Sequence, residues 1–161
     1  MMGKNAAENT MDSQDTSKTI RQMDVDDIDR IMEIEKKSFV APWSKRMFEE
    51  TISSPIYRGL VIEHNHSISG YIIFYTVDVE AHIMNLAINP GERRQGYAQP
   101  LMNYALKFFR GKDISECYLE VREHNRDAQR LYKRFGFEVI GRRNKYYPET
   151  GEDALVMQLL F

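Results

Sequence analysis

One loop of this sequence, with two glycines and two arginines, is well suited to binding an anion. Gly91-Glu92-Arg93-Arg94-Gln95-Gly96 follows an apolar segment that ends at Ile88 and precedes an amphipathic segment that begins near Ala98. When a strand, a tight loop and a helix follow one another, the first N–H groups of the helix are free and the helix dipole favours negative charge. Arg93 and Arg94 could add phosphate contacts. The same residues also fit an ordinary surface turn.

The loop differs from two common phosphate-binding motifs. Gly91 and Gly96 have the glycine spacing of a P-loop, but Tyr97-Ala98 stands where Lys-Ser/Thr would bind the outer phosphate and Mg²⁺. The loop also lacks the G-x-G-x-x-G dinucleotide pattern. These two nucleotide-binding motifs are therefore excluded.

Two further side chains could move protons. Glu120 alternates with core-type residues in an expected strand, so its carboxylate faces away from the core, where it could act as a general base. Tyr132 has a phenol with an ordinary pKa near ~10, which stays protonated at neutral pH and can donate. Each also has a structural interpretation. Glu120 could be solvated or paired with Arg122 or a lysine, and Tyr132 could be a core residue whose hydroxyl finds one partner.

Cysteine and histidine usage excludes other chemistries. The one cysteine, Cys117, allows no internal disulfide and no cysteine-based zinc site, which favours a reducing, cytoplasmic setting. Its apolar neighbours predict a buried thiol, and not a nucleophile. The four histidines lack metal-ligand spacing, so we expect no catalytic metal.

Length and composition favour one globular domain. The chain has 161 residues, of which 42% are hydrophobic. Its 22 basic and 24 acidic residues leave a net charge of −2, which gives no argument for nucleic acid or an anionic membrane as partner. No apolar run approaches the ~18 residues of a membrane helix. Residues 1–17 contain no Ile, Leu, Val or aromatic residue, so we expect a flexible polar leader before a single domain over residues 18–161.

The elements that must position these residues alternate in type along the chain. Hydrophobic periodicity and turn residues predict strands over Lys18 to Met23, Tyr57–His64, Ile68–Val79, Glu80–Ile88, Glu116–Arg122, Glu138–Tyr147 and Ala154–Leu160. They predict helices after the N-cap Asp24, from Ser44 through Ile52, over Ala98–Arg110 and over Asn125–Phe135. The strand around Ile83 to Ile88 is apolar on both parities, so helices should cover both faces of the sheet. The fold class is therefore α/β.

The glycine loop and a second block of residues resemble motifs of a known family. Arg93-x-x-Gly96-x-Ala98, between Leu86-Ala87-Ile88 and a helix, is similar to the acetyl-CoA signature of the GCN5-related N-acetyltransferases (GNAT). Leu119-Glu120-Val121-Arg122, followed by Asn125, Ala128, Leu131-Tyr132 and Gly136-Phe137, resembles that family's second conserved block. The resemblance implies the GNAT fold, with a mixed, mostly antiparallel sheet of about seven strands flanked by about four helices. It covers essentially residues 19–161.

The resemblance also implies roles for individual residues. Glu120 would be the general base, acting through water, and Tyr132 the general acid that protonates the departing CoA sulfur. The residues that would bind acetyl-CoA are Leu86, Ala87, Ile88, Arg93, Arg94, Gln95, Gly96, Tyr97, Ala98, Gln99, Asn125 and Tyr132. A backbone N–H near Ile88 could hold the developing oxyanion. Asn125 also suits a helix N-cap, and Pro100 removes one donor from the first turn of its helix.

Further motifs resemble the RimI-like branch of the family, whose members acetylate the N-terminal alanine of protein eighteen of the small ribosomal subunit. They are Pro42-Trp43-Ser44, the run Leu119-Glu120-Val121-Arg122, and the segment from Arg143 through Tyr146-Tyr147-Pro148 to Ala154. Trp43, Tyr146 and Tyr147 are therefore candidates for binding an N-terminal peptide, although Trp43 could equally anchor two helices. The alternatives are acetylation of a lysine ε-amine or a small-molecule amine, or a CoA-binding module without catalysis. The sequence leaves the oligomeric state open.

Overall fold

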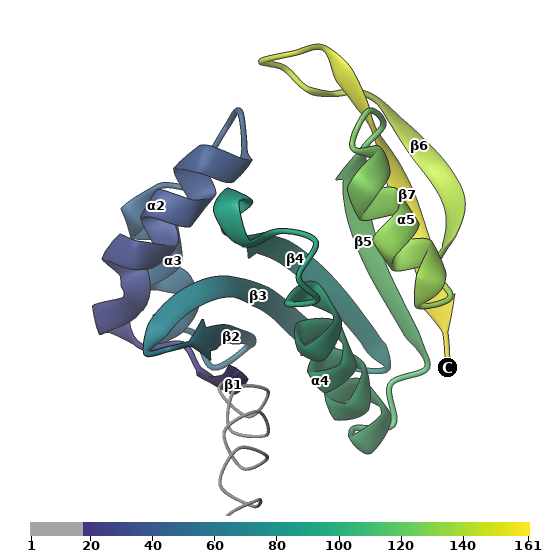
Figure 1. Cartoon of the computed structure of the whole chain (residues 1–161). Coiled ribbons are helices and arrows are strands. Elements are labelled where there is room, and N and C mark those ends of the chain that lie inside the picture. Colours follow the sequence, from purple (N-terminus) through teal and green to yellow (C-terminus); the bar gives the residue numbers. More distant parts are fainter. Residues whose placement is uncertain (1–17) are drawn as a thin grey trace, which may run out of the picture.

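The computed structural model describes residues 18–161, and the expected leader over residues 1–17 lies outside the described residues. The elements follow one another along the chain as shown in Figure 1. The strands are β1 (Lys18–Gln22), β2 (Tyr57–His64), β3 (Ser67–Val77), β4 (Glu80–Ile88), β5 (Glu116–Arg122), β6 (Glu138–Tyr147) and β7 (Glu152–Leu160). The helices are α2 (Ile28–Ser38), α3 (Lys45–Ser53), α4 (Ala98–Gly111) and α5 (Arg126–Arg134), with short 3₁₀ turns η1 (Val25–Asp27) and η2 (Pro90–Glu92).

The seven strands form one sheet in the order β1-β2-β3-β4-β5-β7-β6. All neighbouring pairs are antiparallel except β4 and β5, which run parallel. A mixed sheet of seven strands with four α-helices confirms the predicted fold class. β3 ends two residues earlier than predicted, because Asp78 turns the chain with a φ of 51°. β7 begins two residues earlier than predicted, at Glu152.

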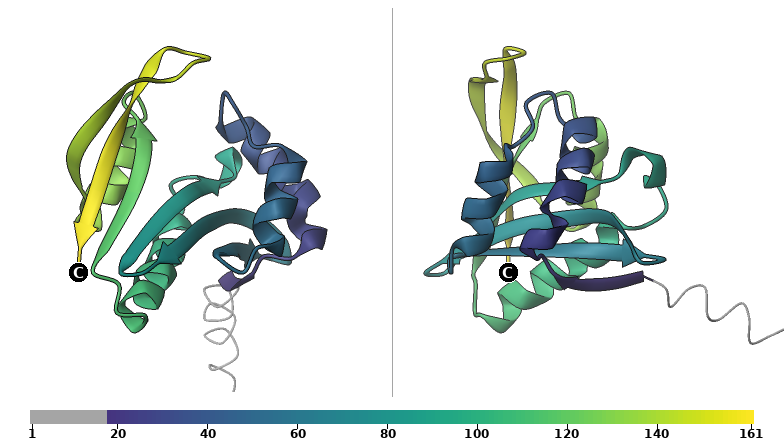
Figure 2. Two further views of the ribbon diagram at one scale, coloured as in Figure 1. Left: turned by 180° about the vertical axis from the view of Figure 1, so that it is seen from behind. Right: turned by 90° about the vertical axis from the view of Figure 1, so that its left-hand side faces the viewer.

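Helices cover both faces of the sheet, as the two-sided apolar strand predicts. Alternate residues of β2 and β3 enter two separate cores. Leu60 and Ile72 pack in the core formed with α4 and α5, whereas Val61 and Ile73 pack in the core formed with α2 and α3. Figure 2 shows the sheet between the two helical layers. Such alternation is the period-two pattern of a strand buried on both sides.

Local sequence signals set the ends of the elements. The Asp24 side chain accepts from the Asp26 N–H and caps η1, which leads directly into α2. Ser44 caps α3 by accepting from the Met47 N–H. Gly136 follows α5 with a φ of 97°, the left-handed conformation that glycine adopts without strain. Among residues 18–161, no helix is long and apolar enough to cross a membrane.

The parallel strands β4 and β5 pair only over their first four residues, from Glu80 with Glu116 to Ile83 with Leu119. Beyond Ile83, β4 remains paired with β3 as far as Ile88, whereas β5 continues beside β7. The two strands therefore diverge, and the diverging ends are visible in the centre of Figure 1. Residues 84–88 of β4 are left without a strand partner on the β5 side, and the candidate site lies there.

Candidate active site

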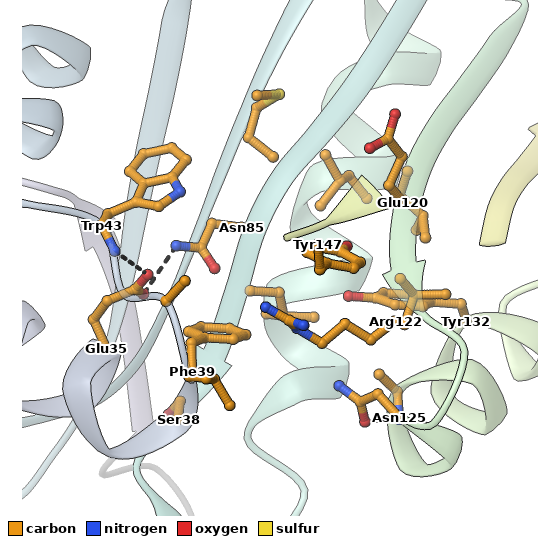
Figure 3. A pocket seen from close by; sticks show the side chains of 18 residues that line it. Glu35, Ser38, Phe39, Trp43, Asn85, Glu120, Arg122, Asn125, Tyr132 and Tyr147 are labelled. Atoms are coloured by element: carbon orange, nitrogen blue, oxygen red, sulfur yellow. Dashed lines mark hydrogen bonds between the residues drawn. The ribbon is translucent and has the colours of Figure 1, made fainter. Parts of the chain in front are cut away.

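A cleft of about 250 Å³ occupies the space between the diverging strands. Figure 3 shows its two walls, with Glu35, Trp43 and Asn85 on one side and Glu120 and Tyr132 on the other. The lining residues come from α2, the loop after it, β4, β5, α5 and the end of β6. They are Glu35, Ser38, Phe39, Val40, Ala41, Trp43, Ile83, Met84, Asn85, Leu86, Leu119, Glu120, Val121, Arg122, Asn125, Ala128, Tyr132 and Tyr147.

Glu120 lies on the cleft wall with its side chain 28% exposed. Its neighbours in β5, Leu119 and Val121, are buried, as the strand alternation predicts. The carboxylate pairs with Arg143, whose Nε lies 2.9 Å from Oε1. A hydrogen bond to the same carboxylate raises the pKa of Tyr146. Both partners come from the irregular end of β6, so that strand fixes the orientation of the carboxylate.

The ion-pair partner of Glu120 is thus Arg143, and not Arg122 as one sequence interpretation had it. Arg122 instead pairs with Glu149 and, at 3.4 Å, with Glu152. Its guanidinium also lies 3.8 Å from the centre of the Tyr147 ring. Burial raises the pKa of Tyr147 to about 12. These contacts tie the hairpin between β6 and β7 to the end of β5.

Tyr132 is 7% exposed and lies in the core, in edge contact with Phe137. Its hydroxyl has no hydrogen-bond partner among residues 18–161, and Figure 3 shows it directed into the cleft. Burial, followed by the nearby Cys117 and Tyr147, raises the pKa of Tyr132 above the usual value. The phenol therefore stays protonated at neutral pH. Core packing and an accessible proton donor are combined in one side chain.

The glycine loop leads into α4 in a conformation that exposes backbone donors. Gly96 has a φ of 79° and Arg94 a φ of 63°. No side chain caps the N-terminus of α4, because Tyr97 at the N-cap makes no capping hydrogen bond. The first N–H groups of a helix have no acceptor within the helix, so they are available to an anion here. Pro100 lies in the first turn and removes one of these donors.

The two arginines of the loop are placed differently. Arg93 donates to the Ile88 carbonyl oxygen at 3.1 Å and to the Ser38 hydroxyl at 3.1 Å, so it ties the loop to β4 and α2. Arg94 is exposed and has no ion-pair partner among residues 18–161. Lys18 donates to the Gln95 carbonyl oxygen at 3.0 Å and also holds the loop. Arg94 is the loop cation that remains available to a ligand.

Asn125 and Trp43 each stabilise the local structure and also line the cleft. The Asn125 side chain accepts from the Ala128 N–H at 3.2 Å and caps α5, as predicted, while it also lines the cleft. The Trp43 ring packs on Phe48, with ring centres 5.2 Å apart. Trp43 therefore anchors the loop to α3 and lines the cleft at the same time, which joins the two sequence interpretations.

The cleft brings together six of the candidate catalytic and binding residues named from the sequence: Trp43, Leu86, Glu120, Asn125, Tyr132 and Tyr147. Tyr146 contacts it through Glu120. The other expected cofactor residues do not line the cleft; they are Ala87, Ile88, Arg93, Arg94, Gln95, Gly96, Tyr97, Ala98 and Gln99. They occupy the end of β4, the loop and the start of α4, and so continue from the cleft-lining part of β4.

Sequence reasoning did not assign a function to Glu35 or Asn85. Glu35 is 1% exposed and Asn85 is also buried, and both line the cleft. The available signal was the position of Glu35 on the apolar face of α2, in register with Ile28 and Ile31. A glutamate among buried isoleucines needs partners. Those partners come from distant segments and were not readable from the pattern.

Comparison with known families decides the classification. The model of the "Acetyltransferase (GNAT) family" matches residues 28–137. The chain belongs to this acetyltransferase family. The matched region runs from the start of α2 to just beyond the end of α5, and it contains both the glycine loop and the strand of Glu120.

Individual proteins similar to this acetyltransferase are also named as acetyltransferases. A Bacillus subtilis (strain 168) protein is 41% identical over 143 residues, covering 88% of this chain and 95% of that protein, and ribosomal protein bS18-alanine N-acetyltransferase activity is provisionally assigned to it. The [ribosomal protein bS18]-alanine N-acetyltransferase of Haemophilus ducreyi is 35% identical, covering 83% of this chain and 93% of that one. The crystal structure of the Escherichia coli ribosomal-protein-S18-alanine N-acetyltransferase has a TM-score of 0.83 at 29% identity, covering 89% and 93% of the two chains.

A cysteine nucleophile finds no support in this acetyltransferase. Cys117 is buried, and burial raises its pKa to about 12, so its thiol is not activated as a nucleophile. Among residues 18–161, no three His, Cys, Asp or Glu side chains gather in an arrangement suited to a metal ion.

Proposed function

We propose that the protein transfers the acetyl group of acetyl-CoA to the N-terminal α-amine of ribosomal protein bS18, whose first residue would be alanine. The relatives named for this reaction cover nearly the whole described chain, at up to 41% identity. The observation that carries the proposal is the cleft itself, in which Glu120 and the Tyr132 hydroxyl, unpaired within residues 18–161, face the free edge of β4. We further propose that residues 18–161 form one acetyltransferase domain.

Acetyl-CoA would bind along the free edge of β4. The extended pantetheine arm can pair with backbone groups of residues 86–88, which have no strand partner on that side. The pyrophosphate would lie at the N-terminus of α4, where free N–H groups and Arg94 suit its charge. Asn125 would contact the pantetheine from α5. The thioester carbonyl would then lie between β4 and β5.

The transfer needs one proton removed and one proton supplied. Glu120 would accept a proton from the amine through water, and the amine nitrogen would attack the carbonyl carbon. A backbone N–H of β4 near Ile88 would hold the developing negative charge on the carbonyl oxygen. As the C–S bond breaks, Tyr132 would give its proton to the sulfur, whose thiol has an ordinary pKa of ~8.5. The products are the acetylated N-terminus and CoA.

The test is an acetyl-transfer assay on a panel of hexapeptides, read by mass spectrometry. The panel contains the N-terminal sequence of bS18 beginning with alanine, the same peptide with another first residue, and a lysine-containing peptide with a blocked N-terminus. We expect acetylation of the free alanine terminus. Acetylation of the blocked peptide alone would overturn the proposal in favour of a lysine acetyltransferase. CoA release without any acceptor dependence would also contradict it.

A further inference from the structure

Glu35 is a carboxylate buried in the wall of the cleft. Its side chain comes from the last turns of α2 and is 1% exposed. It accepts from the Trp43 backbone N–H at 3.0 Å, from the Asn85 side-chain amide at 2.9 Å, and from the Tyr71 hydroxyl. Figure 3 shows the bonds from Trp43 and Asn85. Four parts of the chain, namely α2, the loop after it, β3 and β4, therefore meet at this group.

All three partners of Glu35 are donors, and none is a cation. A carboxylate only accepts, whereas a protonated carboxyl group would need an acceptor for its own proton. The hydrogen-bond set therefore fits the ionised form. Burial, together with the charge of Glu35, raises the pKa of Tyr71, so that hydroxyl stays a donor. Within residues 18–161, no lysine, arginine or histidine forms an ion pair with Glu35.

A buried charge normally has a counter-charge, because removing an ion from water is costly. The one cationic residue among the described residues that line the cleft is Arg122, which is already paired with Glu149 and Glu152. The acceptor in the proposed reaction arrives largely as a cation, since an α-amine has a pKa of ~7.7–8.0. The cleft wall beside Trp43 thus carries a negative charge with no positive partner among the described residues. The ammonium group of the acceptor would provide that positive charge.

We propose that Glu35 is a specificity residue that draws the α-ammonium group of the acceptor into the cleft. This inference rests on the proposed function and adds a step before proton removal. Glu35 is not the base, because three donors already occupy its oxygens and its surface is closed to solvent. The bound ammonium group first loses one proton to solvent, and Glu120, on the opposite wall and more exposed, takes the second proton as the amine attacks. Glu35 attracts the charged amine, and its three hydrogen bonds hold the Trp43 loop and β4 in place around it.

This role has a kinetic signature. A group that stabilises the bound ammonium also stabilises the positive charge that returns to the nitrogen as the amine attacks, so it lowers the free energies of the bound state and of the transition state about equally. Its removal should therefore raise the KM for the peptide and leave kcat nearly unchanged. A purely structural role would affect acetyl-CoA and peptide alike, because the same residue supports β4, along which the cofactor binds.

The experiment compares Glu35→Gln with wild type and with Tyr71→Phe. Glu35→Gln removes the charge at nearly constant size, whereas Tyr71→Phe removes one hydrogen bond and keeps the charge. For the alanine-initiated hexapeptide we expect Glu35→Gln to raise the KM about tenfold, because the attraction between the buried charge and the ammonium group is lost. The KM for acetyl-CoA and kcat should change less than threefold. Tyr71→Phe should leave the peptide KM close to wild type.

A second measurement needs no catalysis. The hexapeptide and its desamino analogue, in which hydrogen replaces the α-amino group, are titrated into the wild-type complex with CoA by calorimetry. We expect the amine to bind about tenfold more tightly than the analogue, and Glu35→Gln to remove that preference. Equal binding of the two peptides to wild type would overturn the inference. So would equal weakening of both peptides in Glu35→Gln. If the assay above fails while the amine preference is present, the proposed reaction is wrong and the charge selection stands.

Discussion

At the scale of single residues, the site depends on how each side chain is partnered. Tyr132 has a buried ring and a hydroxyl without a hydrogen-bond partner within residues 18–161, so its proton is available to a ligand. Glu120 is held by Arg143 and Tyr146. One group is poised to donate, and the other is oriented by neighbours from β6.

Tyr132→Phe tests the proposed acid. The substitution keeps the ring in contact with Phe137 and removes only the hydroxyl, so folding and acetyl-CoA binding should be preserved. We expect kcat to fall by about 10²–10³-fold, within the range of a single general acid. Steady-state kinetics and calorimetric titration with acetyl-CoA measure the two quantities. Turnover equal to wild type would show that the thiolate leaves without this proton.

Glu120→Gln and Arg143→Ala together test the proposed base. We expect Glu120→Gln to lower kcat by about 10²–10⁴-fold, with the largest loss at low pH, where more of the acceptor is protonated. Arg143 is 57% exposed, and exposed ion pairs contribute about 0–1 kcal/mol. Arg143→Ala should therefore lower kcat less than about fivefold. Equal losses in the two variants would show that the guanidinium itself takes part in the reaction.

The sequence predicted part of this residue-scale arrangement. The strand alternation predicts that Glu120 lies outside the core, and core packing is one of the two interpretations that the sequence offers for Tyr132. The partners of Glu120 were not readable, because they depend on a register irregularity between Arg143 and Tyr147. Lys145 lies within it with a φ of 49°, and its N–H bonds to Asp153. Such a bulge reorients side chains without an unambiguous sequence signal.

At the scale of elements, polar contacts join segments whose bounds the sequence predicted well. Capping residues and turn residues fix the ends of α3 and α5 locally, so their positions follow from the sequence. Contacts between elements cannot be predicted from the sequence in this way. Arg21 in β1 binds both Asp27 in η1 and Glu63 in β2, at 2.7 Å each. This triad ties the first strand to the start of α2.

The pH dependence of stability tests that triad. Burial acts to raise the pKa of Asp27, but hydrogen bonds from Arg21 and from the Asp24 N–H outweigh it and hold the pKa below its usual value. A depressed pKa in the folded state adds stability above the unfolded-state value of about 3.9, and this stability is lost as the pH falls through the folded-state pKa. We expect Asp27→Asn to reduce the free energy of unfolding by about 1–3 kcal/mol at pH 7.

Urea denaturation at several pH values between 7 and 3 measures this effect. The difference in the free energy of unfolding between Asp27→Asn and wild type should shrink below about pH 4. There the wild-type carboxyl group becomes protonated and is therefore neutral, like the asparagine side chain. Asp29→Asn is a matched control, since Asp29 is 86% exposed and its ion pair with Lys45 is 3.3 Å long. That control should change stability by less than about 0.5 kcal/mol. A difference for Asp27→Asn that stays constant with pH would contradict an origin in the charge.

At the scale of the whole molecule, the cleft divides the sheet. β1 to β4 with α2, α3 and α4 lie on one side, and β5 to β7 with α5 lie on the other (Figures 1 and 2). The strand link between them is the four-residue pairing of β4 with β5. The sequence predicted the two-sided sheet, but not where the parallel strands part, because that point depends on packing between distant segments. The resemblance to the acetyltransferase family indicated the order of the two motifs along the chain. The cleft itself forms because β4 and β5 separate beyond their four paired residues.

Hydrogen exchange tests whether acetyl-CoA bridges this division. Residues 84–88 have no strand partner on the β5 side, and the first N–H groups of α4 have no helical acceptor. A ligand that pairs with both should slow exchange in these two segments. At a ligand concentration of 100 times Kd, binding should also add about 2.7 kcal/mol to the free energy of unfolding. Exchange measured by mass spectrometry should show the largest slowing there and little local change in β1 and the first half of β2. Protection confined to β5 and β7 would place the cofactor on the other wall and contradict the binding mode proposed for β4.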